Sequence, residues 1–117
     1  MKELTKYNTA CKCGCGYDPT PNLIKIMINY AEEIAGIDFE ISSWSRCIKH
    51  NASIKNSSPT SSHLKGIAVD IRTADNEERF RVLKGLLRAG FVRILIYKTF
   101  IHADMDEAKT MKIAVLM

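Results

Sequence analysis

The sequence predicts a single α+β domain over residues 1–117, with two main helices and a small, mainly antiparallel sheet. Its length of 117 residues is typical of one domain. Two segments carry apolar residues at helical spacing, and shorter segments with strand-like alternation lie between and after them. The last of these short segments follow one another closely, which favours an α+β arrangement.

The first helix is predicted to begin near Pro21 and to end at Gly36, because a proline suits the first turn and a glycine a helix end. Asp18 or Thr20 can cap its start. The apolar residues expected on its buried face are Leu23, Ile24, Met27, Tyr30, Ala31 and Ile34.

Three shorter elements are predicted in the middle of the chain. Residues 37–41 alternate apolar and polar side chains, which indicates a half-buried strand. A short helix is predicted around residues 46–52. Residues 66–73 predict a second strand, in which Asp70 lies on the face opposite to Val69 and Ile71.

The second long helix begins where Asp75 and Glu78 have the spacing of a capping box, and it ends at Gly90. Its buried face is expected to contain Phe80, Leu83, Leu86 and Leu87. Three further strands are predicted at residues 92–97, 100–105 and 111–117.

Composition excludes several classes of protein. Hydrophobic residues make up 46% of the chain and charged residues 26%, which excludes a disordered tail, a coiled coil and a collagen-like repeat. No apolar run approaches the roughly 18 residues of a membrane-spanning helix. The start, Met1 to Leu4, lacks the apolar region of a signal peptide. We therefore expect a monomer that is synthesised in the cytoplasm without a signal peptide and does not insert into membranes.

The charge is mildly basic, with 17 Lys and Arg against 13 Asp and Glu, a net +4. This favours anionic partners such as nucleic acid, cell-wall polymers or acidic lipid. The chain has no run of five basic residues and no basic stripe interleaved with aromatic residues. We therefore expect no nucleic-acid binding.

Two histidines lie beside predicted strands that also carry an aspartate. His63 precedes Asp70 by seven residues, and Gly66 permits a sharp turn between them. His102 and Asp104 share one face of a later strand. Two imidazoles and one or two carboxylates are the ligand types of a catalytic zinc ion, which leaves a fourth position for water. Taken singly, each residue also fits a structural role, in a salt bridge or in the sheet.

The order of these residues resembles a known family, the M15-type zinc D-Ala-D-Ala carboxypeptidases. The pattern S-x-H-x-x-G-x-A-x-D at residues 61–70 and the later F-I-H-A-D at residues 100–104 carry the resemblance. Residues 41–47 and the C-G-C-G at residues 13–16 resemble further blocks, the latter in a compact phage-type branch. The family is related to vancomycin-resistance D,D-dipeptidases and Hedgehog signalling domains. The resemblance therefore implies a Hedgehog/D,D-peptidase-like fold over roughly residues 8–105.

The resemblance also implies roles for particular residues. His63, Asp70 and His102 would bind a zinc ion. Arg46 would lie over the open coordination position and hold the scissile carbonyl oxygen or a substrate carboxylate. Ser61 would either hydrogen-bond the substrate or orient His63.

The general base is the point at which this chain departs from the resemblance. Many relatives have Glu or Asp three residues before the last zinc histidine, where this chain has Thr99, which cannot accept a proton at neutral pH. We expect Asp104 to act as the base, because it shares a strand face with His102. The alternatives are that Asp104 orients that histidine or forms a salt bridge.

The four cysteines, Cys11, Cys13, Cys15 and Cys47, leave several interpretations open. Structural zinc sites usually have two to four residues between paired cysteines, so the alternate spacing fits such a site poorly. A disulfide from Cys47 to Cys13 or Cys15 would need an oxidising compartment. Buried free thiols are the other interpretation.

Together these features predict a zinc-dependent hydrolase that cleaves amide bonds in peptidoglycan stem peptides, as a carboxypeptidase or an endopeptidase. The missing signal peptide and wall-binding module lead us to expect a phage-type lytic enzyme (an endolysin or virion protein) that acts at the bacterial cell wall. The alternative is a non-catalytic peptidoglycan-binding or virion module that keeps the fold and the zinc site.

Overall fold

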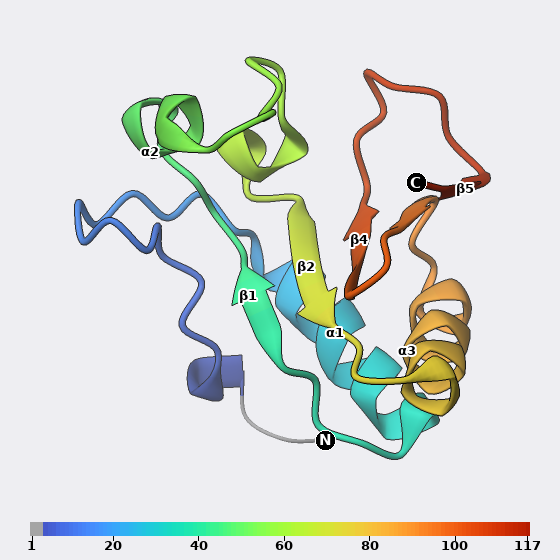
Figure 1. Cartoon of the computed structure of the whole chain (residues 1–117). Helices are drawn as coiled ribbons and strands as arrows, with labels where there is room; N and C mark the ends of the chain where they lie inside the picture. Colours follow the sequence, from blue (N-terminus) through green and yellow to red (C-terminus); the bar gives the residue numbers. More distant parts are fainter. Residues whose placement is uncertain (1–3) are drawn as a thin grey trace.

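A five-stranded sheet forms the centre of the protein in a computed structural model that describes residues 4–117 (Figure 1). Neighbouring strands are antiparallel, except that the last strand runs parallel to β3. The mainly antiparallel α+β fold predicted from the sequence is therefore confirmed. In the order β1-β2-β4-β3-β5, the strands are β1 (Ile41–Ser43), β2 (Ala68–Arg72), β4 (Phe100–Asp104), β3 (Arg93–Ile96) and β5 (Ile113–Leu116).

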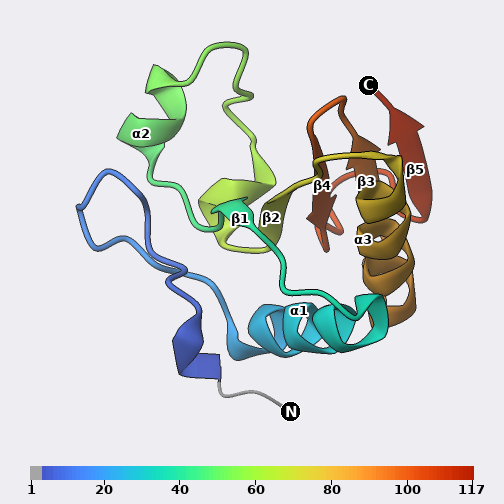
Figure 2. The ribbon, with the colours of Figure 1, turned by 60° about the horizontal axis from the view of Figure 1, so that its bottom comes forward.

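Two long helices, α1 (Asn22–Ala35) and α3 (Asn76–Ala89), pack against each other and against one face of the sheet (Figure 2). Alternation along β2 and β4 directs Val69 and Ile101 into the core and leaves the intervening side chains on the other face. The buried core consists of Ile24, Met27, Ile28, Ala31, Trp44, Val69, Ile71, Val82, Leu86, Phe91, Ile94, Ile101 and Ala103.

Three short helices complete the described chain: η1 (Leu4–Lys6), α2 (Ile48–Ser53) and η2 (Ser62–Lys65). None of the helices within residues 4–117 combines the length and the hydropathy of a bilayer-spanning segment. The expectation about a signal peptide concerns the first four residues, and residues 1–3 lie outside the described residues.

Two glycines are required by close backbone contacts. A Cβ atom at Gly85 of α3 would lie 2.4 Å from the carbonyl oxygen of Ala31 in α1, so only glycine allows the two helices to pack this closely. Gly66 ends η2 with a φ of 72°, and a Cβ atom there would lie 2.5 Å from the backbone nitrogen of Thr20. Gly66 therefore sets the turn that separates η2 from β2.

The buried face of α1 differs from the sequence prediction. Leu23 and Tyr30 are 61% and 46% exposed, whereas Ile28 is fully buried. Pro21 occupies the cap position and no side chain caps the helix. Asp18 instead accepts hydrogen bonds from Thr9 and from the backbone N–H of Thr20.

The face of α3 is rotated in a similar way. Phe80 and Leu87 are exposed, and Val82 is buried instead. The contact with α1 causes this rotation, because the face of α3 that contains its glycine is the one that must meet α1. The predicted start is confirmed, since the Asp75 side chain accepts a hydrogen bond from the Glu78 N–H at 2.8 Å.

The first strand was predicted four residues too early. Residues 37–40 form no strand, and β1 begins at Ile41. The buried carboxylate of Glu32 accepts the backbone N–H of Phe39 at 2.7 Å, so this N–H is not available to a sheet. The alternating pattern arises because Ile37 and Phe39 pack onto the core from an irregular segment.

Candidate metal centre

The polar face of β2 and β4 carries the first two candidate ligands. Asp70 and His102 are direct partners in the antiparallel register, so their side chains lie on the same face. The Nδ1 atom of His102 is 3.0 Å from the Oδ1 atom of Asp70. Both residues are located by the strand pairing that also forms the hydrophobic core on the opposite face.

The third candidate ligand, His63, comes from η2. The Ser61 side chain caps this turn by accepting the His63 N–H, and the His63 carbonyl oxygen accepts the backbone N–H of Arg46. The ring is 3% exposed, and its Nε2 atom lies 3.2 Å from the Oδ1 atom of Asp70. Ser61 thus contacts the backbone of His63, and the two roles expected for its side chain stay predictions.

Each imidazole ring is fixed by an acceptor on its other nitrogen. The Nδ1 atom of His63 is 2.7 Å from the carbonyl oxygen of Trp44, which can only accept a hydrogen bond. The Nε2 atom of His102 is 2.6 Å from the carboxylate of Asp104. Both of these nitrogens therefore carry hydrogen, and a neutral ring presents its remaining lone pair to Asp70.

Two lone pairs directed at one carboxylate oxygen require a positive charge between them, either protons or a metal ion. Burial raises the pKa of Asp70, but hydrogen bonds from His102 and His63 outweigh it and hold the pKa below its usual range. Burial lowers the pKa of His102, but hydrogen bonds to Asp104 and Asp70 raise it above the usual value. The geometry therefore calls for either a protonated imidazole or a metal ion beside an ionised carboxylate.

The donor set fits a zinc ion. One ligand atom each from His63, Asp70 and His102 lies within 4.8 Å of the other two. Zinc with bonds of about 2.0–2.2 Å in a tetrahedron separates its donors by about 3.4 Å, which is close to the observed 3.0 and 3.2 Å. Imidazole nitrogen and carboxylate oxygen are also the donor types found in catalytic zinc sites.

Arg46 lies beside Asp70, one of the three candidate ligands. The Nη2 atom of Arg46 is 3.9 Å from the carboxylate of Asp70, and its Nη1 atom donates a hydrogen bond to the Asn51 side chain at 2.9 Å. Burial lowers the pKa of Arg46, while the charge of Asp70 raises it. Its Nε atom is buried and has no hydrogen-bond partner within residues 4–117. This arrangement holds a guanidinium in a site of restricted solvent access.

Asp104, the expected general base, lies behind His102. Asp104 is fully buried. Besides its contact with His102, it pairs with the guanidinium of Arg93 at 3.1 Å and accepts a hydrogen bond from the backbone N–H of Asp106 at 3.0 Å. Burial raises its pKa, but the hydrogen bond from His102 and the neighbouring charges lower it. Its oxygens are therefore engaged in holding His102. Thr99 is exposed in the turn between β3 and β4.

The three candidate ligands, Arg46 and Asp104 line one cleft with a volume of about 430 Å³. Within the described residues, Asp70 and Asp104 are the carboxylates that line it. The stacked rings of Tyr97 and Phe100, with centroids 4.3 Å apart, form an aromatic wall. The predicted site residues that the cleft brings together are Arg46, Ser61, His63, Asp70, His102 and Asp104.

Sequence reasoning missed Asp106, which fixes η2 to the segment after β4. This residue is 1% exposed, accepts hydrogen bonds from Ser62 at 2.8 Å and Ala108 at 3.1 Å, and pairs with Lys65 at 2.9 Å. Because η2 carries His63, the contacts of Asp106 help to set the position of the His63 ring in the cleft. No motif marks this role, since the contact joins positions 44 residues apart.

The four cysteines form a second group outside this cleft, and none of them is in a disulfide. Of the four, Cys11 is buried, whereas Cys13 and Cys15 are exposed and Cys47 is half-buried. The burial expected for free thiols is thus found at Cys11 and not at the other three cysteines.

Two imidazoles and a carboxylate that converge in an open cleft are typical of metal-dependent hydrolases. A comparison with protein families specifies the class. The Peptidase M15 family model matches residues 1–104, and the chain belongs to this family of zinc peptidases. The family resemblance stated from the motifs is thereby confirmed. No curated protein and no solved structure matches the chain significantly.

The contacts of Asp106 predict a pH effect on stability. Burial raises its pKa, but hydrogen bonds from Lys65, Ser62 and Ala108 lower it to about 2. An unfolded Asp has a pKa of about 4, so the unfolded state binds more protons between these values and stability falls as the pH decreases. Between pH values of about 5 and about 2, the free energy of unfolding of Asp106→Asn should therefore fall by about 2 kcal/mol less than that of the native protein. Urea unfolding at a series of pH values measures this difference.

The matched control for this experiment is Glu107→Gln, which changes the neighbouring exposed carboxylate. This variant should keep the pH dependence of the native protein. The same pH dependence in Asp106→Asn would contradict the role assigned to Asp106.

Proposed function

We propose that the protein is a zinc-dependent peptidase that hydrolyses an amide bond in peptidoglycan stem peptides. The observation that carries this proposal is the convergence of His63, Asp70 and His102 on one point of the cleft, beside Arg46. Membership in the Peptidase M15 family supports the peptidase activity. The motifs at residues 61–70 and 100–104 support a cell-wall substrate, cleaved by D,D-carboxypeptidase or L,D- or D,D-endopeptidase action.

His63, Asp70 and His102 would hold the zinc ion. When bound, zinc supplies a Lewis acid that polarises a carbonyl oxygen and makes water a nucleophile near neutral pH. The carbonyl oxygen of Trp44 and the carboxylate of Asp104 keep both rings in the tautomer that directs a lone pair to the ion. The acceptors behind the rings thereby pre-orient two of the three ligands.

Arg46 would stabilise the negative charge that develops on the substrate carbonyl, or bind a substrate carboxylate. Asn51 and Ser43 orient its guanidinium, and its Nε atom is free to donate within the described residues. A fixed charge in a site of restricted solvent access acts more strongly than one in bulk water.

The charge of the cleft supports an anionic substrate. Its cationic side chains outnumber the two carboxylates, one of which is a candidate zinc ligand. Stem peptides carry free carboxylates, which such a lining attracts. These cationic residues are Arg46, Lys55, Arg93 and Lys109.

As a phage-type lytic enzyme, the protein would act on the bacterial wall during lysis or as part of a virion. We propose no stable partner besides the stem peptide. The cell wall, as an anionic polymer, also fits the net charge of +4.

For Asp104 we propose a positioning role, because all its described contacts hold other groups. Its carboxylate binds His102, Arg93 and the backbone N–H of Asp106, so both of its oxygens already have partners. The role of general base remains the competing prediction, since the cleft has no carboxylate besides Asp104 and Asp70 within residues 4–117.

His63→Ala should abolish both zinc binding in the cleft and hydrolysis, because it removes one of three ligands. The measurement is release of product from purified peptidoglycan and from a pentapeptide ending in D-Ala-D-Ala, with and without a chelator. His50→Ala is the matched control, since this histidine lies outside the cleft and should leave turnover unchanged.

Failure of the native protein to release product from either substrate at any metal concentration would contradict the enzymatic proposal. Retained binding to peptidoglycan in that case would support the alternative, a binding module that keeps the fold.

Asp104→Asn distinguishes the two roles of that residue. As a positioning residue, Asp104 raises zinc affinity, so the variant should bind zinc about 10- to 100-fold more weakly and regain turnover when zinc is added in excess. Zinc titration and steady-state kinetics measure both quantities. Unchanged zinc affinity together with turnover that excess zinc does not restore would instead identify Asp104 as the base.

A further inference from the structure

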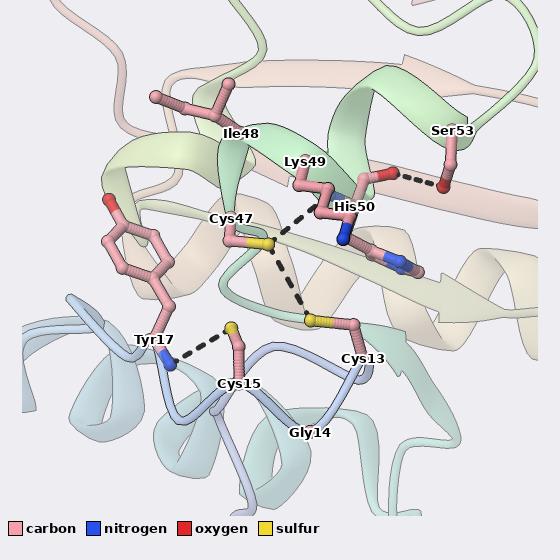
Figure 3. A pocket seen from close by; sticks show the side chains of 9 residues that line it. All are labelled: Cys13, Gly14, Cys15, Tyr17, Cys47, Ile48, Lys49, His50 and Ser53. Atoms are coloured by element: carbon pink, nitrogen blue, oxygen red, sulfur yellow. Dashed lines mark hydrogen bonds between the residues drawn. The ribbon is translucent and has the colours of Figure 1, made fainter.

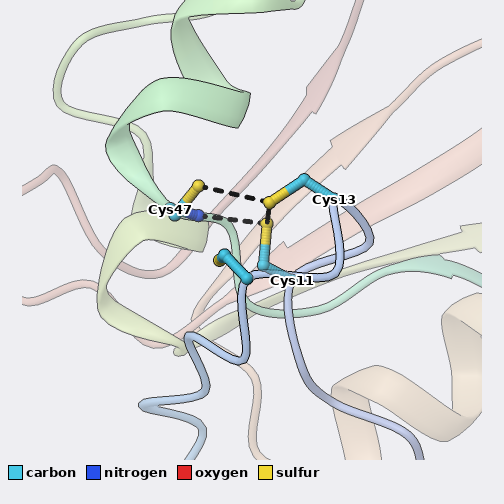
Figure 4. A group of neighbouring side chains, drawn as sticks. Cys11, Cys13 and Cys47 are labelled. Atoms are coloured by element: carbon cyan, nitrogen blue, oxygen red, sulfur yellow. Dashed lines mark hydrogen bonds between the residues drawn. The ribbon is translucent and has the colours of Figure 1, made fainter.

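The four cysteines gather where the loop of residues 11–15 meets the start of α2. Every sulfur atom of the group lies within 4.8 Å of the others. The sulfur atom of Cys13 is 3.5 Å from that of Cys11 and 3.7 Å from that of Cys47. Figure 4 shows these three sulfurs directed toward one another. Residues 36 positions apart in the sequence thus contribute to one cluster.

The sulfur separations match those of thiolates around one zinc ion. Zinc–sulfur bonds of about 2.3 Å in a tetrahedron place the sulfurs about 3.8 Å apart, close to the observed 3.5 and 3.7 Å. A disulfide bond would bring two sulfurs to about 2.05 Å, whereas all four cysteines are free. The separations therefore fit a metal site and do not fit a disulfide.

Backbone N–H groups are directed at the sulfurs. Cys11 accepts the N–H of Cys47 at 3.4 Å, and the Cys47 sulfur accepts the N–H of His50 at 3.3 Å. Cys15 accepts the N–H of Tyr17 at 3.4 Å (Figure 3). Hydrogen bonds to the charged form favour a thiolate, which is the form that binds metals. The loop and the first turn of α2 thus supply donors for three of the four ligands.

The backbone of the loop explains how alternate residues can share one ion. Gly14 and Gly16 both have a φ of 85°, a conformation that other residues rarely adopt. These turns direct the side chains of Cys13 and Cys15 toward Cys47, as Figure 3 shows. Cysteines at alternate positions of this loop can therefore face one point.

We propose that the protein contains a second metal site, a structural zinc ion bound by four thiolates. Four protein ligands leave no position for water, so this site would stabilise the fold and would not catalyse hydrolysis. The proposal goes beyond the hydrolytic centre and does not depend on it. The four ligands are Cys11, Cys13, Cys15 and Cys47.

The site would fix the arginine of the hydrolytic cleft. Cys47 caps α2 and directly follows Arg46, while Asn51 in α2 accepts a hydrogen bond from the guanidinium. A zinc ion at the cysteines would therefore join the N-terminal loop to the segment that positions Arg46. Because the unfolded chain lacks this site, metal binding would add to the free energy of unfolding.

The test separates this site from the cleft. Proteins are purified under reducing conditions with zinc, and bound metal is measured by elemental analysis. His63→Ala/His102→Ala should retain one zinc per chain, and cobalt in its place should give a thiolate-to-cobalt charge-transfer absorption. This double variant keeps all four cysteines, so the result does not depend on whether a cysteine variant folds.

Cys13→Ser/Cys15→Ser should lose this absorption and unfold at a lower temperature than the native protein. Lys12→Ser is the matched control, since it changes an exposed residue of the same loop and should keep the metal. Absence of bound metal, or a cobalt spectrum without the thiolate band, in the histidine double variant would overturn the proposal. Loss of hydrolysis alone would not, because that outcome concerns the cleft.

Discussion

The candidate metal centre depends on one carboxylate oxygen that faces two imidazole nitrogens. Oδ1 of Asp70 lies 3.2 Å from His63 and 3.0 Å from His102, and the far nitrogen of each ring is held by a group that only accepts hydrogen bonds. Neutral rings would therefore direct lone pairs at a negative oxygen, which is unfavourable without a cation. A zinc ion held by these residues would resolve this conflict and supply a Lewis acid to the cleft.

The rest of the fold serves to hold these three side chains. The antiparallel pairing of β2 and β4 sets Asp70 opposite His102, and the same strands bury their other face against α1 and α3. The position of His63 depends on contacts outside the sheet. Gly66 turns the chain after η2, and Asp106 fixes η2 to the segment after β4. In the cysteine cluster, Cys47 caps α2 and directly follows Arg46 in the sequence. Hydrophobic packing thus fixes the strands that carry Asp70 and His102, and polar contacts fix the helix that carries His63.

The sequence allowed prediction of the fold class, the family and the two strands that carry Asp70 and His102, because the alternation at residues 66–73 and the ordered motifs are local features. The short helix η2, which carries His63, was not predicted. The sequence did not allow prediction of which face of α1 is buried, since Leu23 and Ile28 both fit a helical stripe and the contact at Gly85 decides between them. The role of Asp106 depends on tertiary contacts, which no spacing reveals. The cysteine spacing argued against a metal site because it carries no information about backbone turns.

The most direct test of the proposed zinc site is a crystal structure of the zinc-loaded protein with anomalous scattering recorded at the zinc absorption edge. The proposed site predicts an anomalous peak within about 2.0–2.2 Å of one donor atom from each of His63, Asp70 and His102. Electron density in which these three side chains contact one another directly, with no anomalous peak between them, would contradict it.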